Sequence, residues 1–214
     1  MRFAGVHGFT MPNTVAVILA GGAGQRIGGH KPQRRLNGQR LIDIAKAHIA
    51  ADRLRMAVAV RTLDQIPQVG AEQIIDANID GPLGGVIAAL HWGDDLNARF
   101  VLTIPCDMPF LPRDLFLRLA SERRNEARPS VAACAGRVHP VCALWPVTCL
   151  QPVLNFAAFG QRSLKGALDT CDAMSVEWPD APYDPFLNLN TDAEMVQAEM
   201  RANGITHIRQ ELAS

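Results

Sequence analysis

The chain has 214 residues, of which 48% are hydrophobic and 20% charged, and its 21 basic and 21 acidic residues give a formal net charge of zero. This length suits one well-filled α/β core. The balanced charge argues against nucleic acid or a membrane surface as a partner. No apolar run approaches the ~18 residues that suggest a membrane span.

The cysteines and the N-terminal segment both predict a cytoplasmic protein. The five cysteines form no CxxC pair, and their odd number fits poorly with a disulfide framework, so we expect buried, reduced side chains. Residues 1–13 lack the apolar core and the cleavage site of a signal peptide. We predict that they form a flexible lead-in, in which Met11 is an alternative start. Residues 14–214 are expected to form a single domain.

In the first half of the chain, apolar runs alternate with segments of helical period. Val15–Ala20 is apolar and ends in glycines, which is the pattern of a buried parallel strand. From near Arg40, apolar residues recur at i, i+3, i+4, i+7 and i+8, which predicts a helix. The other elements expected here are strands at Met56–Val60, Gln73–Ile75 and Phe100–Ile104 and a helix at Leu83–Trp92.

The same alternation continues in the second half. Pro112 suits a first helical turn, so a helix is predicted from there to about Arg124. Phe186–Leu189 begins an apolar–polar alternation that indicates a strand, from which Asn188 and Asn190 would project on the same side. The remaining elements expected are strands at Ser130–Cys134, Val141–Trp145 and Met174–Trp178 and helices at Val147–Ala157, Ser163–Thr170 and Asp192–Asn203.

This alternation of strands and helices predicts an α/β fold of three layers, α/β/α, around a doubly wound and mostly parallel sheet. Such sheets bind ligands beyond the carboxyl ends of their strands, at the point where the strand order reverses. Two of the predicted strands end in unusual sequences. One is followed by the glycine-rich segment Gly21–Gly29, and the other by Pro105, Cys106 and Asp107.

The segment Gly21–Gly29 contains five glycines, which predicts a loop that binds an anion. Glycine tolerates positive φ and lets backbone N–H groups approach a ligand, and several such groups form an anion-binding concavity. Arg26 and Lys31 add positive charge, and no acidic residue lies between Val15 and Ile42. The spacing matches neither the P-loop nor the dinucleotide-binding fingerprint. We therefore expect a small anionic ligand here, with a long flexible connection as the alternative.

Asp107 and Asp76 each follow a predicted strand. A carboxylate at the mouth of a parallel sheet is well placed to hold Mg²⁺, a hard cation that prefers oxygen ligands. An aspartate after a strand is also a common turn residue or helix cap. The glycine-rich loop favours the metal-binding interpretation for Asp107, whereas both interpretations stay open for Asp76.

Several segments together resemble a known family. The run VAVILAGGAGQRIGGHK, which starts at Val15, is similar to the signature of the GT-A-like nucleotidyltransferases, LAGG-x-G-x-R-M followed by Lys. Within that group the chain most resembles the molybdenum cofactor guanylyltransferases, through RLNGQRLID, IIDANIDGPLGG, IPCDMPFLP, HPVCALW and FLNLNTDAE. The resemblance covers about Val15 to Met200 and implies a Rossmann-like nucleotidyltransferase fold. His139, in HPVCALW, would either line the substrate cleft or serve packing.

The resemblance also implies a reaction and its residues. GMP would be transferred from GTP to the terminal phosphate of molybdopterin, or of its molybdenum-bound form, with release of pyrophosphate. Mg²⁺ is the implied cofactor and Asp107 its ligand, and there is room for transient contacts with other cofactor-biosynthesis proteins or target apoenzymes. The other implied sites are guanosine and phosphate binding by Leu19, Ala20, Gly21 and Gly22, catalytic triphosphate contacts by Arg26 and Lys31, nucleotide recognition by Asp76, and pterin binding by Asn188 and Asn190.

The chain departs from the family pattern in the loop and in the second strand. His30 stands where an acidic residue usually precedes the loop lysine, and the loop is one residue shorter. The second predicted strand ends at Val60-Arg61, where the family often has an asparagine. Two other functions therefore stay open: a CTP- or UTP-dependent transferase acting on a pterin, polyol or sugar phosphate, and a non-catalytic nucleotide-binding or cofactor-carrier protein. Asn190 also has an alternative role, as the cap of the helix expected at Asp192.

Overall fold

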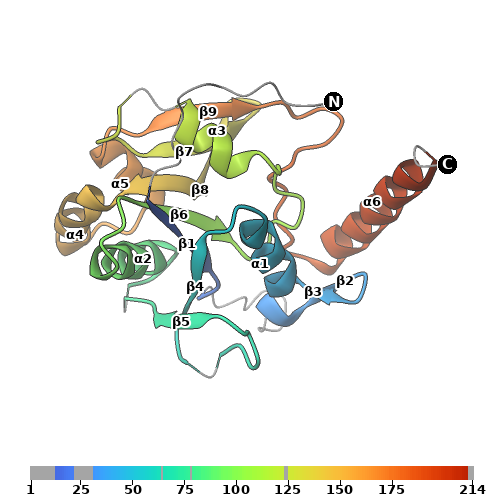
Figure 1. The fold of residues 1–214 in the computed structure, drawn as a ribbon, viewed down its shortest axis with the longest axis horizontal. Helices are drawn as coiled ribbons and strands as arrows, with labels where there is room; N and C mark the ends of the chain where they lie inside the picture. Colours follow the sequence, from blue (N-terminus) through green and yellow to red (C-terminus); the bar gives the residue numbers. More distant parts are fainter. Residues whose placement is uncertain (1–12, 22–30, 64, 78, 123–124, 212–214) are drawn as a thin grey trace.

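The computed structural model describes residues 13–21, 31–63, 65–77, 79–122 and 125–211, the last seven by their backbone alone. Seven strands in these segments form one sheet: β1 (Thr14–Leu19), β4 (Arg55–Val60), β5 (Glu72–Ile75), β6 (Phe100–Pro105), β7 (Ser130–Cys134), β8 (Arg137–Pro146) and β9 (Met174–Trp178). Their order is β5-β4-β1-β6-β8-β7-β9 (Figure 1). All neighbouring pairs are parallel except those of β8, which runs antiparallel to β6 and β7.

Helices lie on both faces of this sheet, and a two-stranded hairpin lies apart from it (Figure 1). The helices are α1 (Leu41–Ala51), α2 (Leu83–Asp95), α3 (Leu115–Ser121), α4 (Leu150–Ala158), α5 (Leu164–Thr170) and α6 (Asp192–Glu211). The shorter elements are the 3₁₀ turns η2 (Lys31–Gln33) and η3 (Val147–Cys149) and the hairpin strands β2 (Arg35–Leu36) and β3 (Gln39–Arg40). The predicted three-layer α/β/α fold with a mostly parallel sheet is confirmed.

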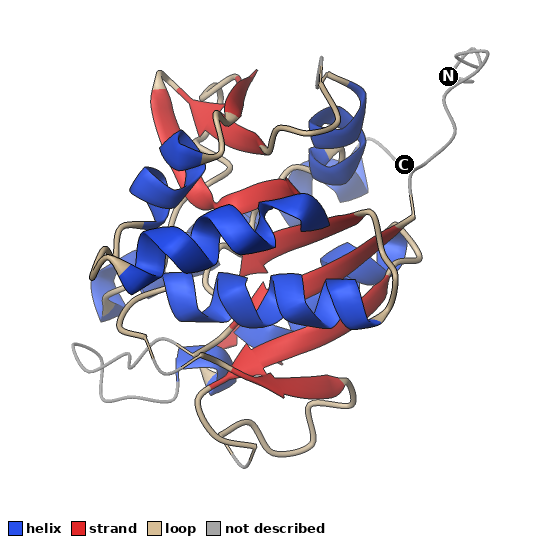
Figure 2. Ribbon diagram, turned by 90° about the vertical axis from the view of Figure 1, so that its left-hand side faces the viewer, coloured by secondary structure: helices blue, strands red, loops and turns tan. Residues whose placement is uncertain are grey.

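The sheet is buried on both faces because helices cover each of them, and successive strand residues point alternately to the two faces. Along β1, Ala16 and Ile18 belong to the core that α1 and α3 cover, and Val15 and Val17 belong to the core that α2, α4 and α5 cover. Figure 2 looks onto the second of these faces, with its helices in front of the strands. A continuous apolar run therefore forms a central strand here, as predicted for a parallel sheet with helices on both sides.

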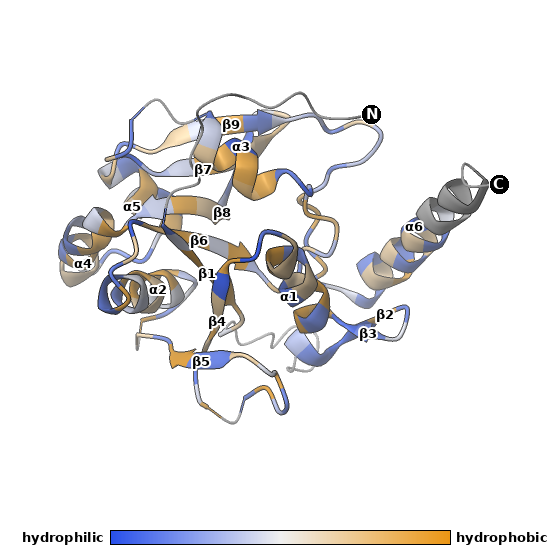
Figure 3. Ribbon diagram, in the orientation of Figure 1, coloured by the Kyte–Doolittle hydropathy of each residue, from blue (hydrophilic) through white to orange (hydrophobic). Residues whose placement is uncertain are grey.

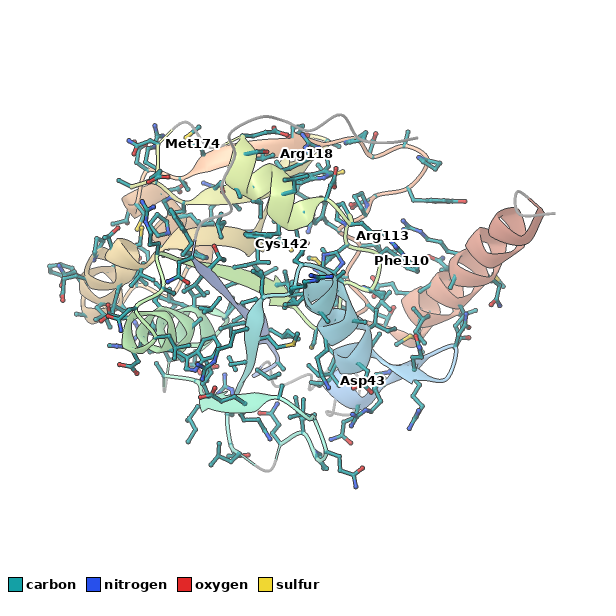
Figure 4. The ribbon with its side chains drawn as sticks, viewed as in Figure 1. Asp43, Phe110, Arg113, Arg118, Cys142 and Met174 are labelled. Atoms are coloured by element: carbon teal, nitrogen blue, oxygen red, sulfur yellow. The ribbon has the colours of Figure 1, made fainter. Side chains whose placement is uncertain are left out.

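The C-terminal helix α6 projects from the body and is attached near its start (Figure 1). A small cluster of buried residues joins it to β2, to α1 and to the segment before it: Leu36, Leu41, Leu189, Met195 and Ala198. The guanidinium of Arg201 lies 4.1 Å from the ring centroid of Phe110, which is labelled in Figure 4. Figure 3 shows the hydrophilic β2–β3 hairpin in blue, in contrast to the hydrophobic residues along β6 and α3.

Most predicted elements form within a few residues of the expected positions, but three form with different bounds and a fourth does not form. The helix expected from Pro112 to Arg124 is the shorter α3, which begins at Leu115 after a turn. β8 is longer than Val141–Trp145 because it forms a hairpin with β7 through Ala135 and Gly136, whose positive φ angles of 50° and 72° suit a tight two-residue turn. The helix expected to end at Asn203 continues to Glu211.

The strand expected at Phe186–Leu189 is wrong, because the structure has an irregular segment there. Its two fully buried residues are Phe186 and Leu189, so the inward-facing positions are three residues apart rather than two. The N–H of Leu189 donates to the carbonyl oxygen of Asp107 at 3.0 Å, which fixes this segment over the end of β6. Asn188 and Asn190 consequently do not project from one side of a strand.

Other expectations about the chain concern its cysteines and its ends. All five cysteines are free; four are buried and Cys171 is half-buried, which agrees with their predicted packing role. The predicted lead-in lies outside the described residues except for Asn13, whose amide donates to the carbonyl oxygen of Asn97 at 3.0 Å. In the part of the chain that the structure describes, no helix has the length and apolar character needed to cross a membrane.

Candidate active site

The carboxyl ends of β1 and β6 lie side by side at the point where the strand order reverses. From β1 the chain passes to β4 and β5 on one side, and it then returns to β6 on the other. The N–H of Cys106, just past β6, donates to the carbonyl oxygen of Leu19 at 3.3 Å. Gly21, which begins the glycine-rich segment, and Asp107 therefore both follow strand ends at the place where such sheets bind ligands.

Three predicted site residues come together at this point. Lys31, which begins η2, forms an ion pair with Asp107 and donates a hydrogen bond of 2.6 Å to Oδ1 of Asn190. The side chains of Lys31 and Asp107 are 15% and 16% exposed, so the ion pair is largely shielded but reachable by solvent. The predicted triphosphate contact, the predicted metal ligand and one predicted pterin residue thus form a single polar cluster, drawn from three distant parts of the sequence.

Thr191, rather than Asn190, caps α6. Oγ1 of Thr191 accepts from the N–H of Glu194, while Oε2 of Glu194 accepts from the N–H groups of Asn190 and Thr191 at 2.6 and 2.8 Å. This is the reciprocal capping box that a Thr-x-x-Glu sequence forms. The bond from the backbone of Asn190 is the main reason why the pKa of the Glu194 carboxyl is lowered. The Asn190 side chain therefore remains with Lys31, and the alternative role of Asn190 as the helix cap is wrong.

Asp76 lies on the other side of β1, just past β5, where its N–H donates to the carbonyl oxygen of Val60 at 2.7 Å. Its Oδ1 is buried and has no hydrogen-bond partner among the described residues. Burial raises the pKa of Asp76 to about 6, although the nearby positive charge of Arg61 opposes this rise. A half-buried carboxylate with an unused acceptor is a candidate for binding the donor groups of a ligand.

Two glycines allow Asp76 to take this position. A Cβ at Gly21 would lie 2.6 Å from Oδ2 of Asp76, and a Cβ at Gly84 would lie 2.2 Å from Oδ1 and 2.3 Å from the carbonyl oxygen of Ala77. All three distances are far below van der Waals contact, so a side chain at either position would displace the carboxylate or the backbone. The absence of a side chain at Gly21, in the predicted loop, and at Gly84, in the GPLGG segment, therefore has the same explanation: both positions leave room for Asp76.

Sequence reasoning missed two residues that hold the start of the glycine-rich segment. Nε of Arg61 donates to the carbonyl oxygen of Gly21 at 2.8 Å, and Nε2 of Gln65 donates to that of Ala20 at 2.9 Å. The sequence marks Arg61 only as a departure from the family pattern, which often has an asparagine at this position. No local pattern marks the bond from Gln65 to Ala20, since these two residues are 45 positions apart in the chain.

A polar pocket of about 160 Å³ lies beside the Lys31 cluster. Its lining residues are Arg137, Asp184, Phe186, Leu187, Asn188, Asn190 and Glu194. Both predicted pterin residues thus border one cavity, although they are not on one strand. His139 is buried and stacks on Phe186 with ring centroids 4.6 Å apart, but it is not among the lining residues. Burial lowers the pKa of His139.

Residues 16–173 match a protein family described as the MobA-like NTP transferase domain. The chain belongs to this family. A molybdenum cofactor guanylyltransferase of Rhodopseudomonas palustris (strain BisB5) is 39% identical over 88% of this chain and 93% of that protein. This family membership makes the protein a nucleotidyltransferase, as predicted. Lys31, Asp76 and Asp107 lie inside the matched region, whereas Asn188 and Asn190 lie beyond it.

Solved structures agree with the fold of this nucleotidyltransferase. Molybdopterin-guanine dinucleotide biosynthesis protein A from Archaeoglobus fulgidus has a TM-score of 0.70 at 22% identity, covering 89% of this chain and 99% of that one. A 4-diphosphocytidyl-2C-methyl-D-erythritol synthase from Anaerococcus prevotii also has a TM-score of 0.70, at 13% identity, covering 90% and 96%. At these identities the likeness concerns the fold alone.

Not every predicted site residue can be placed. Gly22 and Arg26 lie outside the described residues. Cys106 is buried beside Asp107, and burial raises the pKa of its thiol, which suits the packing role expected of it rather than a nucleophilic one. The described residues contain no cluster of three or more His, Cys, Asp or Glu side chains that could hold a metal ion by themselves.

Proposed function

We propose that the protein transfers the GMP group of GTP to the terminal phosphate of molybdopterin. An oxygen of that phosphate attacks the α-phosphorus of GTP, the bond from the α-phosphorus to the bridging oxygen breaks, and pyrophosphate leaves with the bonding electrons. The observation that carries the proposal is the Lys31–Asp107 pair at the strand-order reversal, where the ends of β1 and β6 are joined by the bond from Cys106 to Leu19. The family and its 39% identical relative, a molybdenum cofactor guanylyltransferase, support the same reaction.

The residues fit a reaction that needs alignment and charge neutralisation more than proton transfer. The attacking phosphate is already anionic, so no general base is required. The Lys31 ammonium neutralises negative charge on the phosphates, and the backbone N–H groups at the start of the glycine-rich segment add fixed donors. Arg26 would add a second cation. In this scheme Lys31 exchanges its ion pair with Asp107 for contact with the nucleotide.

The donor groups around Asp107 also fit Mg²⁺. Magnesium sites in such enzymes use one or two carboxylates and complete the coordination with nucleotide phosphates and water. One partly buried carboxylate at this edge of the sheet meets that requirement without a preformed cluster of ligands. Asp107 would hold the ion, which when bound supplies positive charge to the phosphates. This carboxylate already has a cationic partner, because the Lys31 ammonium forms an ion pair with it.

The two substrates would bind on either side of the Lys31 cluster. The proposed contacts of the nucleotide are Leu19, Ala20, Gly21 and the carboxylate of Asp76. The polar pocket bordered by Asn188 and Asn190 is the proposed pterin site, because amide groups offer both the donors and the acceptors that the edge of a pterin needs. Lys31 reaches the proposed pterin pocket through Asn190 and is paired with Asp107, and this position suits the residue that must act on the phosphates joining the substrates.

Three further predictions accompany this proposal. Residues 14–214 act as one domain, the protein works in the cytoplasm, and it makes transient contacts with proteins that deliver or receive the cofactor. Each is open to a direct check, by limited proteolysis, by fractionation and by co-purification with other cofactor-biosynthesis proteins or target apoenzymes.

The proposed reaction is tested by incubating the protein with molybdopterin and, separately, GTP, ATP, CTP or UTP. We expect Mg²⁺-dependent pyrophosphate release with GTP, and loss of turnover in excess EDTA. Asp107→Asn should remove this turnover, whereas the matched variant Asp172→Asn, at an exposed carboxylate remote from the cluster, should retain it. Equal turnover with CTP or UTP would favour the related transferases, and nucleotide binding without any pyrophosphate release would favour a carrier protein.

A further inference from the structure

Gln65, in the segment between β4 and β5, takes part in four hydrogen bonds with other described residues through its backbone and its side chain. Its backbone N–H donates to the carbonyl oxygen of Thr62 at 3.1 Å, and its side-chain Oε1 accepts from the N–H of Arg61 at 2.7 Å. Its side-chain Nε2 donates to the carbonyl oxygen of Ala20 at 2.9 Å. Finally, its own carbonyl oxygen accepts from Nε2 of Gln33 at 3.2 Å.

These bonds connect both flanks of the glycine-rich segment. Ala20 is the residue just before it, and Gln33 stands in the same 3₁₀ turn as Lys31, just after it. Arg61 adds a second bond on the first flank, from Nε to the carbonyl oxygen of Gly21. The two flanks are therefore held to one short segment, which is itself anchored to β4.

The hydrogen bonds to the carbonyl groups of Ala20 and Gly21 also affect the direction of a backbone N–H group. In a trans peptide the C=O and N–H groups point in opposite directions. When Gln65 holds the carbonyl of Ala20, the N–H of Gly21 in the same peptide plane points away from Gln65. Arg61 also holds the carbonyl oxygen of Gly21. The backbone donor of Gly21 is thus oriented by a side chain that need not touch a ligand.

We propose that Gln65 and Arg61 are positioning residues of the nucleotide site, which hold the start of the glycine-rich segment and Lys31 in a fixed relation. The inference rests on the proposed binding of a nucleoside triphosphate there. Gly21 and Lys31 must act on the same triphosphate, and a change of about 1 Å in their separation is enough to disturb catalysis. Gln65 is the direct link between the two flanks, and Arg61 supports the first of them.

The test is Gln65→Glu, which keeps the shape and the acceptor for the Arg61 N–H but replaces the donor to Ala20 with an oxygen. Steady-state kinetics in both substrates and thermal unfolding are measured on the full chain. We expect the KM for GTP to rise about tenfold or more, as for the loss of one hydrogen bond at a binding site. The KM for molybdopterin should stay within about twofold. Gln68→Glu, the same change three residues along, should match the wild type.

Two further variants keep the test decisive if Gln65→Glu folds poorly. Gln65→Met removes both side-chain bonds without adding charge, and Gln33→Met removes only the link to the second flank. Both should raise the KM for GTP alone, Gln33→Met by less. An unchanged KM for GTP in the folded variants, or an equal rise for both substrates, overturns the proposal. Turnover of the wild-type protein tests the proposed function separately from this inference. If the wild type prefers another nucleotide to GTP, the KM of each variant is compared with that of the wild type for that nucleotide.

Discussion

Asp76→Asn should stabilise the protein near neutral pH while weakening its hold on the nucleotide. In the folded chain the pKa of Asp76 is raised from 3.8 to about 6 because burial penalises the charged form. Below pH 3.8 the carboxyl is neutral in both states and contributes nothing. As the pH rises from 3.8 to about 6, the unfolded chain releases the proton while the folded chain retains it, so the stability falls. Above pH 6 the full cost of the buried charge remains.

The size of this effect follows from the same pKa values. At about 1.36 kcal/mol for each pKa unit, the charge costs at most about 3 kcal/mol above pH 6. The side chain is only half-buried, and solvent screening reduces this figure, so we expect a gain of about 1–2 kcal/mol from Asp76→Asn at pH 7.5. The gain should largely vanish at pH 4. Removing an acceptor that the nucleotide needs should at the same time lower GTP affinity by roughly tenfold.

Denaturant unfolding at pH 7.5 and pH 4, with GTP titrations on the same samples, measures both effects. Asp80→Asn is the matched control, since Asp80 is exposed only four residues away, and its unfolding free energy should change little at either pH. The reasoning is refuted if Asp76→Asn destabilises the protein at pH 7.5, or if the gain is the same at both pH values. The first result would mean that the Asp76 carboxylate is stabilised in the folded chain by partners other than Arg61, and the second would mean that the gain does not come from the cost of burying its charge.

Three other substitutions test the Lys31 cluster and its surroundings. Lys31→Ala should slow pyrophosphate release by roughly 10²–10³, the scale of losing one donor to developing charge, with little change in thermal stability; a loss of less than about tenfold would contradict its role. Asn188→Ala should raise the KM for molybdopterin and leave that for GTP unchanged, whereas Asn190→Ala should raise both, because Asn190 bonds Lys31; identical effects of the two variants would exclude this division. Thr191→Ala should lower the unfolding free energy by about 1 kcal/mol through loss of the cap, and calorimetry showing no change would argue against the capping box.

Local sequence was enough to predict most of the fold. Buried parallel strands read as continuous apolar runs, and β1, β4 and β6 formed within a residue of their predicted ends. The Thr191–Glu194 box is also local, but the alternative interpretation of this segment placed the cap one residue too early, at Asn190. The prediction for Phe186–Leu189 was wrong because its alternation of residue types matched a strand. In the structure Phe186 packs on His139 and Trp178, and Leu189 packs in the cluster at the start of α6, and these contacts select a spacing of three.

The chemistry of the loop was likewise readable from the chain alone. Five glycines after a buried strand, with nearby cations, indicate an anion site because glycine frees the backbone N–H groups to approach a ligand. The position of Asp107 after a strand indicated that it faces the same edge of the sheet. Both inferences depend only on residue type and on the end of a strand at which a residue stands.

Only the tertiary structure decided which of these residues meet. Lys31 and Asn190 are 159 residues apart in the sequence, and they bond because a segment after β9 returns over the end of β6. Gln65 reaches Ala20 because β4 and β1 are neighbours in the sheet, a pairing that no local pattern specifies. Sequence fixes the chemical groups and the local backbone at each position, whereas contacts between distant positions depend on strand order and on how the strands and helices pack, which involve the whole chain at once.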